Sequence, residues 1–186
     1  FQQLQSDAPP MGWPFVKRRM KSELGADWES KFKSFEKTAA AAASLGQVHK
    51  AVSLTGETLA CKLQYPDMQS AIDSDLNQLK LIFSLYERYD PSIKTSAIHT
   101  ELSERLREEL DYTREAKHQR LYEFMLKDEK NIHVPHVHAE LSTDRLLTSS
   151  WVDGRKILSF KDADKQTRAT LALNMFRAWY VPLYYT

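Results

Sequence analysis

A lysine in the middle of a predicted strand is the residue that most clearly indicates chemistry. The stretch Leu59–Gln64 alternates so that Lys62 and Cys61 lie on opposite faces of an extended chain. A lysine within an otherwise buried strand is costly unless its charge is paired, and its ammonium group suits the oxygens of a phosphate. The alternative is an edge-strand lysine whose ammonium group lies in solvent.

An alanine-rich segment precedes this strand. Its sequence is Ala41-Ala42-Ala43-Ser44-Leu45-Gly46-Gln47-Val48. A protein kinase carries the pattern G-x-G-x-x-G-x-V at this place, in the loop that covers the nucleotide phosphates, so alanine here takes the first two glycine positions. Because alanine resists the open conformations that glycine reaches, we expect a stiffer loop that lies closer over the phosphates. The alternative is an alanine-rich helical turn in the core.

Acidic residues on a predicted helix offer the charge that Lys62 needs. The helix predicted from Ser96 to Lys127 carries four of them in its centre: Glu108, Glu109, Asp111 and Glu115. At about 100° per residue, the first, third and fourth of these lie within roughly 60° of one another on the same face. Like charges at this spacing repel, so the face is either solvated or matched by a cation, for which Lys62 is the candidate.

A second predicted strand, Arg145–Val152, runs into the sequence Asp153-Gly154. This arrangement is similar to the fifth strand of a kinase and the hinge that follows it. The backbone carbonyl of Ser150 and the amide of Val152 would then face an adenine, with Val48 and Ala60 on either side of the ring. The alternative is a plain hairpin strand followed by a turn.

Composition and charge bound the class of protein. The chain has 186 residues, of which 42% are hydrophobic and 27% charged, as in a soluble globular protein. The net charge of +1 provides no overall field to attract nucleic acid or an anionic membrane. Cys61 is the single cysteine, which excludes an internal disulfide or a cysteine zinc site and fits a reducing compartment. No apolar run approaches the roughly 18 residues needed to span a bilayer.

Periodicity and turn residues predict the elements that must position these side chains. Residues 1–34 favour helices, with Pro14 in a first turn and Gly25 as a stop, and the apolar residues Trp28, Phe32 and Phe35 continue at helical spacing. The remaining order is two strands (Val48–Val52, Thr58–Tyr65), two helices (Asp67–Tyr89, Ser96–Lys127), two strands (Val137–Leu141, Arg145–Val152), a turn at Asp153-Gly154 and a helix (Asp162–Tyr180). We expect an α+β fold in which the two hairpins form a small antiparallel sheet beside the long helices.

Four motifs in order resemble the UbiB/ADCK family of atypical kinases. They are Leu4-Gln5 with Pro9-Pro10, Ala41–His49, Cys61–Pro66 and Glu109–Ala116. These are similar, in turn, to the segment after the family's K-x-G-Q motif, to its alanine-rich loop, to the strand that follows, and to its E-x-D motif leading into R-E-A. The resemblance covers essentially the whole chain.

The resemblance implies a protein-kinase-like fold with extra helices that occlude the site of a peptide substrate. It implies binding of ATP with magnesium, activity as an ATPase or small-molecule kinase, and support of coenzyme Q (ubiquinone) biosynthesis. Lys62 then matches the nucleotide lysine, Glu115 its partner, and Glu109 and Asp111 the E-x-D acids. The residues expected at the nucleotide are Ala41, Ala42, Ala43, Ser44, Gly46, Gln47, Val48, Ala60, Lys62, Ser150 and Val152.

The resemblance also implies how the chain is divided. Residues 1–34 would form an N-terminal helical extension, 35–155 the kinase-like N-lobe, and 156–186 the start of a truncated C-lobe. The K-x-G-Q motif would precede Phe1, while the catalytic aspartate loop and the magnesium ligands of D-F-G would follow Thr186. The fragment by itself is therefore expected not to turn over ATP.

The implied partner is an adenine nucleotide, and the full-length chain would also meet membrane lipids or coenzyme Q biosynthesis proteins; nucleic acid is not expected. The implied location is cytoplasmic, at a membrane surface in a bacterium, or mitochondrial in a eukaryote. Two alternatives stay open: a small-molecule phosphotransferase of the same fold with another acceptor, and a non-enzymatic helical interaction domain whose lysine and acids are surface charge.

Three histidines, His133, His136 and His138, raise the question of a metal site. The second and third fall on one face of an extended stretch. Because zinc requires a third or fourth ligand within reach, we expect a polar cluster of loop histidines and no metal held by this chain.

Overall fold

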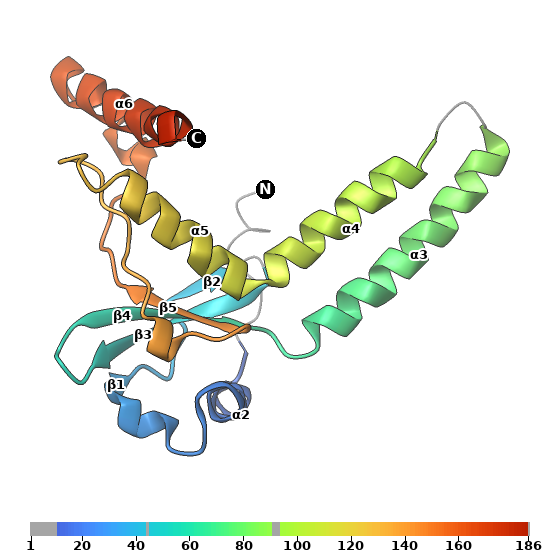
Figure 1. The fold of residues 1–186 in the computed structure, drawn as a ribbon, viewed down its shortest axis with the longest axis horizontal. Helices are drawn as coiled ribbons and strands as arrows, with labels where there is room; N and C mark the ends of the chain where they lie inside the picture. The colour runs from blue at the N-terminus through green and yellow to red at the C-terminus, as the bar shows by residue number, and fades with distance from the viewer. Residues whose placement is uncertain (1–10, 44, 91–93, 186) are drawn as a thin grey trace.

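An antiparallel sheet forms the centre of the structure, a computed structural model that describes residues 11–43, 45–90 and 94–185. Its strands are β1 (Phe32–Phe35), β2 (Ala41–Ala43), β3 (Gly46–Ser53), β4 (Thr58–Gln64) and β5 (Leu146–Ser150). β3 pairs with β1, β2 and β4, and β5 extends the sheet beyond β4 (Figure 1). The predicted α+β fold with a small antiparallel sheet is confirmed.

One face of the sheet is covered by α2 (Trp13–Leu24). This helix has Pro14 in its first turn and ends at Gly25, whose φ of 96° is a conformation that glycine adopts readily. A shared core includes the buried side chains of Val16, Met20, Leu59, Cys61 and Leu63. Burial raises the pKa of the Cys61 thiol to about 12, so this cysteine is a small core residue and not a nucleophile.

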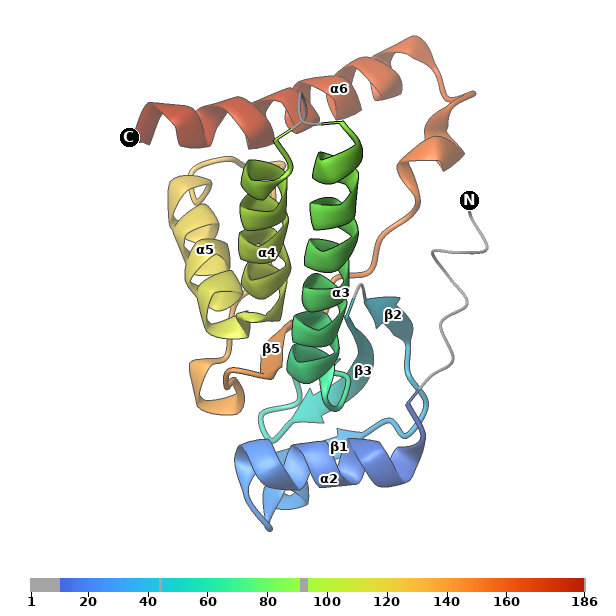
Figure 2. The ribbon, with the colours of Figure 1, turned by 90° about the vertical axis from the view of Figure 1, so that its right-hand side faces the viewer.

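The opposite face carries three further helices. Figure 2 shows α3 (Met68–Tyr89), α4 (Ser96–Leu110) and α5 (Tyr112–Met125) on the side of the sheet away from α2. α3 and α4 form an antiparallel pair that projects from the sheet. α5 lies against the sheet, where a second cluster joins Tyr112, Ala116, Val137 and Leu147. The candidate site lies on this second face.

The single helix predicted for Ser96–Lys127 is wrong, because the chain breaks at Asp111. This residue has φ −90° and ψ 85°, and its carboxylate accepts a hydrogen bond of 2.8 Å from the backbone N–H of Arg114. Aspartate is among the best residues at a helix N-cap. Since α4 and α5 leave this break in different directions, Glu108, Asp111 and Glu115 do not share one helical face.

The helical prediction for Trp28–Phe35 is also wrong. A short 3-10 helix, η1 (Trp28–Lys31), leads into β1, which pairs antiparallel with β3. The aromatic rings still pack together: the Trp28 and Phe35 centroids lie 5.3 Å apart, and Phe35 stacks on His49. The predicted boundary between residues 34 and 35 thus falls inside β1, while the division of the chain into three domains stays a prediction.

The segment predicted as a strand at Val137–Leu141 makes only an isolated bridge between Val137 and Ser149, followed by the 3-10 helix η2 (Ala139–Leu141). The turn predicted at Asp153-Gly154 is also absent, because residues 151–156 are irregular chain without a turn. They are followed by η3 (Ile157–Phe160), α6 (Lys165–Tyr180) and η4 (Val181–Tyr185). Within the described ranges, no helix is both long enough and apolar enough to cross a membrane.

Candidate functional site

Lys62 and Glu115 form an ion pair at the centre of the candidate site. Lys62 Nζ lies 2.7 Å from both Oε1 and Oε2 of Glu115. The Lys62 side chain is 23% exposed and that of Glu115 is 42% exposed, so water reaches the pair from one side. The predicted pairing is present, with β4 supplying the cation and α5 the anion.

Strand alternation and the start of α5 bring the two side chains together. Leu59, Cys61 and Leu63 are fully buried on the α2 face of β4, so Lys62 must point to the other face. On α5, Tyr112 and Ala116 are one turn apart and both are buried against the sheet. Glu115, which directly precedes Ala116, is thereby carried to β4.

A cavity of about 440 Å³ opens beside the ion pair. It is lined by Lys62, Glu108, Glu109, Arg114, Glu115 and His118. Arg114 binds Glu108 at 2.6 Å, and hydrogen bonds from Arg114 and then Arg105 lower the pKa of Glu108. The lining therefore offers ammonium and guanidinium groups that suit phosphate oxygens, next to carboxylates that suit a phosphate-bound cation.

Sequence reasoning missed two residues of this cavity. Arg114 and His118 both line it, and their spacing of four residues on one helix was a signal that they share a face. Tyr112 was missed as well: its ring lies under Lys62, with Nζ 4.7 Å from the ring centroid.

The alanine-rich segment forms a hairpin with the strand that follows it. Ala41 pairs with Val48 and Ala43 with Gly46 in an antiparallel register, so β2 extends the sheet next to β3. Ser44, in the connection, lies outside the residues that the structure describes. In the pairing of β3 with β4, Val48 is directly opposite Lys62, which places the two side chains on the same face of the sheet.

Ala60 shares this face through the alternation of β4, but Gln47 does not. Its side chain is 1% exposed and lies on the face toward α2. There its Oε1 accepts a hydrogen bond of 2.6 Å from Met11 N–H, and its Nε2 lies 2.7 Å from Nε2 of His49. Of the residues predicted at the nucleotide, Gln47 can therefore contribute only its backbone.

The two acids of the E-x-D motif lie in different surroundings. Glu109 lines the cavity with Lys62, whereas Asp111 lines a separate cavity of about 460 Å³ together with Asp73 and Arg107. The Asp111 carboxylate caps α5 and thereby stabilises the start of the helix that carries Glu115. The structure thus brings Glu109, and not Asp111, to the Lys62–Glu115 pair.

Comparison with known proteins places this arrangement in a family. Residues 3–185 match the model of the ABC1 atypical kinase-like domain. The chain belongs to the ABC1 family. The predicted resemblance to the UbiB/ADCK atypical kinases is therefore confirmed.

Relatives of this ABC1 chain are named as kinases. It is 34% identical over 174 residues to the atypical kinase COQ8, mitochondrial, of Saccharomyces cerevisiae, covering 94% of the chain and 35% of that protein. It is 32% identical to the probable serine/threonine-protein kinase abkA of Dictyostelium discoideum, covering 92% of the chain and 33% of that protein. The chain thus spans about a third of the length of these relatives.

A solved structure supports the same fold. The Mycobacterium tuberculosis protein Rv3197, determined in complex with erythromycin, superposes with a TM-score of 0.76 at 32% sequence identity. The match covers 86% of this ABC1 chain and 41% of that one.

The end of β5 is the place where the ABC1 domain was predicted to meet an adenine. Ser150 is the last residue of β5, and its hydroxyl donates a hydrogen bond of 2.7 Å to Glu57. Val152 follows in the irregular segment and is 49% exposed. Both residues therefore lie where a hinge was predicted, and contact with a nucleotide stays a prediction.

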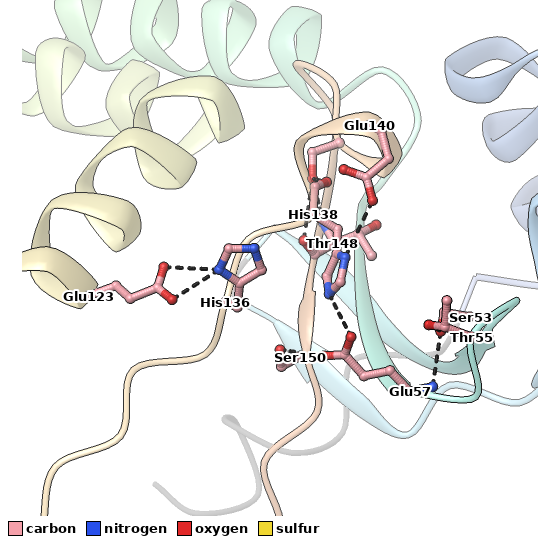
Figure 3. Close-up of polar contacts among 10 residues, drawn as sticks. Ser53, Thr55, Glu57, Glu123, His136, His138, Glu140, Thr148 and Ser150 are labelled. Carbon is pink, nitrogen blue, oxygen red and sulfur yellow. Dashed lines mark hydrogen bonds and ion pairs between the residues drawn. The ribbon is translucent and has the colours of Figure 1, made fainter. Parts of the chain in front are cut away.

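Two of the histidines of this ABC1 chain gather beside Ser150, as Figure 3 shows. His136 Nδ1 lies 2.9 Å from Oε1 of Glu123. His138 lies between two carboxylates, each 3.4 Å from one of its ring nitrogens: Glu57 and Glu140. Among the described residues, no group of three or more His, Cys, Asp or Glu side chains is placed to hold a metal ion.

The hydrogen-bonded carboxyl of Glu57 should make the stability of the ABC1 domain depend on pH. The hydrogen bond from Ser150, and then the neighbouring His138, lower the pKa of this carboxyl. A lowered folded-state pKa adds stability above the unfolded value, about 4.3 for glutamate, and this stability is lost as the pH falls through the folded pKa. Because Glu57 is 42% exposed, screening limits the effect to less than about 1 kcal/mol.

We expect Glu57→Gln to lower the free energy of unfolding at about pH 7 and to lower it by less at about pH 3, because the stability from the ionised carboxylate is lost as the pH falls through its folded-state pKa. Urea unfolding of the full-length protein at both values measures this difference. Glu104→Gln, an exposed glutamate on α4, is the control and should change stability at neither pH. An equal loss of unfolding free energy at both pH values would show that the charge of the Glu57 carboxylate does not stabilise its contacts with Ser150 and His138.

Proposed function

We propose that this chain is the nucleotide-binding lobe of an atypical kinase that binds ATP with magnesium. The observation that carries the proposal is the 2.7 Å Lys62–Glu115 pair, held in a polar cavity of an ABC1 domain. The pair joins a strand to a helix, which is how kinases fix the lysine that holds the α- and β-phosphates. Lys62 supplies the charge, and Glu115 keeps it pointing into the cavity.

The lining of the cavity supports a polyphosphate ligand. Lys62 and Arg114 offer donors to phosphate oxygens, and Glu109 stands near them as a carboxylate for a phosphate-bound cation. Bound magnesium would neutralise the charge that develops on the phosphates. Val48 and Ala60, on the same face of the sheet as Lys62, offer apolar contacts for the base.

For the whole protein we infer an atypical kinase or ATPase that supports ubiquinone biosynthesis. The support is the family resemblance together with yeast and Caenorhabditis elegans relatives that are named as atypical kinases. Those two relatives are also named mitochondrial, which favours that location if the source is a eukaryote. We infer contacts with membrane lipids or biosynthetic partner proteins only through the full-length chain.

Titration calorimetry of the full-length protein with ATP and magnesium tests the nucleotide-binding proposal. Saturable binding at one site is expected, and it should weaken when magnesium is chelated. Absence of binding under both conditions would remove nucleotide binding from the proposal and favour the non-enzymatic interaction domain.

The alanine-rich segment gives a second test of the proposal. In the full-length protein the double substitution Ala41→Gly and Ala43→Gly should change ATP affinity more than stability. Each glycine frees backbone in β2, at a stability cost of about 0.5–1 kcal/mol. The position of this hairpin would set the geometry of the bound phosphates, so the affinity for ATP should change by more than the stability does.

Affinity and thermal stability are measured side by side, with Ala97→Gly as the control for an exposed alanine on α4, away from the site. The control should lose less than about 1 kcal/mol of stability, because Ala97 lies in the first turn of α4, and it should lose no affinity. A large loss of stability with unaltered affinity in the double variant would mean that the alanines only pack the sheet.

A further inference from the structure

Tyr112 lies where α5 meets the sheet, under Lys62 of β4 and next to Gly46 of the β2–β3 hairpin. It is the first residue of α5 and is 1% exposed. Its ring packs in the cluster with Ala116, Val137 and Leu147, which holds it against the sheet. Tyr112 therefore has a fixed position directly under the side chain of Lys62.

The ring face and the Glu115 carboxylate hold the Lys62 ammonium group between them. Nζ is 4.7 Å from the Tyr112 ring centroid and 2.7 Å from both carboxylate oxygens. A cation is attracted to the face of an aromatic ring, and the attraction grows when water is excluded from one side. A lysine side chain is otherwise a flexible stem, so this contact restricts where its charge points.

The hydroxyl of Tyr112 has a different setting. Its oxygen is buried and has no hydrogen-bond partner among the described residues. Burial, and then the nearby Glu115 and Glu109 carboxylates, raise the pKa of this phenol far above its usual range, so the ring stays neutral. The oxygen would lie 3.1 Å from a Cβ built on Gly46. The contact of Tyr112 with Lys62 is therefore made by the face of its ring and not by its hydroxyl.

We propose that Tyr112 is a positioning residue that orients the Lys62 ammonium group through its ring face. Glu115 by itself would leave the lysine stem free to follow the carboxylate, while the buried ring fixes the second side of the charge. The consequence for binding rests on the proposed nucleotide-binding function, because the oriented charge is the one that would meet the phosphates. The contact with Lys62 itself does not rest on it.

Three variants of the full-length protein separate the ring from its hydroxyl: Tyr112→Phe, Tyr112→Leu and, as a control on the same helix, Tyr122→Leu, whose side chain is 43% exposed. The first readout is NMR of ¹³C-labelled lysine, with the Lys62 signal assigned by its loss in Lys62→Met. Ring currents should shift the Lys62 ε-protons upfield in the wild type, in Tyr112→Phe and in the control. Tyr112→Leu should abolish the shift.

The second readout is the affinity for ATP with magnesium. Tyr112→Phe should bind within about twofold of the wild type, and Tyr112→Leu should bind about tenfold more weakly. An unshifted Lys62 signal in the wild type would overturn the proposal even if Tyr112→Leu does not fold. Equal losses of affinity in Tyr112→Phe and Tyr112→Leu would also overturn it, because the hydroxyl would then be the acting group. A shifted signal in a wild type that binds no ATP would support the positioning contact and contradict the proposed function.

Discussion

Replacing Lys62 with methionine is expected to reduce the affinity of the full-length protein for ATP by about 10- to 100-fold. Methionine keeps most of the volume of the side chain and removes the charge. Hydrogen bonds from an ammonium group to phosphate oxygens are charge-assisted, and the Lys62 side chain is only 23% exposed, so water replaces them poorly.

Titration with ATP and magnesium measures this loss, and urea unfolding checks that the variant is folded. Stability should change little, because Glu115 is 42% exposed and can be solvated when its partner is gone. His136→Ala is the control, since His136 is 60% exposed and pairs with Glu123 away from the cavity. Equal affinity in the wild type and in Lys62→Met would remove the main support for a kinase-like site.

Replacing Gly46 with alanine is expected to cause a large loss of stability. A Cβ at this position would overlap the backbone carbonyl oxygen of Leu63 and would lie 3.1 Å from the Tyr112 hydroxyl oxygen. The first neighbour is backbone in β4 and cannot rotate away, so β3 and β4 would have to separate. Such overpacking costs about 1–3 kcal/mol, and a clash with backbone belongs at the upper end.

Gly154→Ala is the matched control, because a Cβ there meets nothing within 4 Å. It should leave stability unchanged or raise it by up to about 1 kcal/mol, since alanine restricts the unfolded chain. Urea unfolding of both variants in the full-length protein measures the difference. If Gly46→Ala were as stable as Gly154→Ala, close packing against β4 would not explain why the alanine-rich segment has a glycine at position 46.

Much of the site was predictable because its signals are local. The alternation of Leu59–Gln64 determines that Lys62 and Cys61 face opposite ways, and the structure buries Cys61 and leaves Lys62 at a cavity. Pro14 and Gly25 mark the ends of α2 because their backbone preferences do not depend on the rest of the molecule. The order of motifs was sufficient to indicate the family and the Lys62–Glu115 pair.

Other features were decided by contacts between distant segments. The helical spacing of Trp28, Phe32 and Phe35 fits one face of a helix, but pairing of β1 with β3 satisfies the backbone of Phe32–Phe35 and brings Phe35 onto His49. No local property of that segment distinguishes the two outcomes, because the deciding hydrogen bonds come from residues about 20 positions away.

The break at Asp111 had a local signal, since aspartate is a strong N-cap, but its consequence is tertiary. Only the change of direction between α4 and α5 decides that Glu109 joins Lys62 while Asp111 lines another cavity. In the same way, alternation alone places Gln47 on the face of β3 opposite Val48, and only the presence of α2 and Met11 makes that face the interior. The sequence by itself thus determined which residues carry charge and in what order, whereas the packing of α5 and α2 on opposite faces of the sheet decided which of them meet.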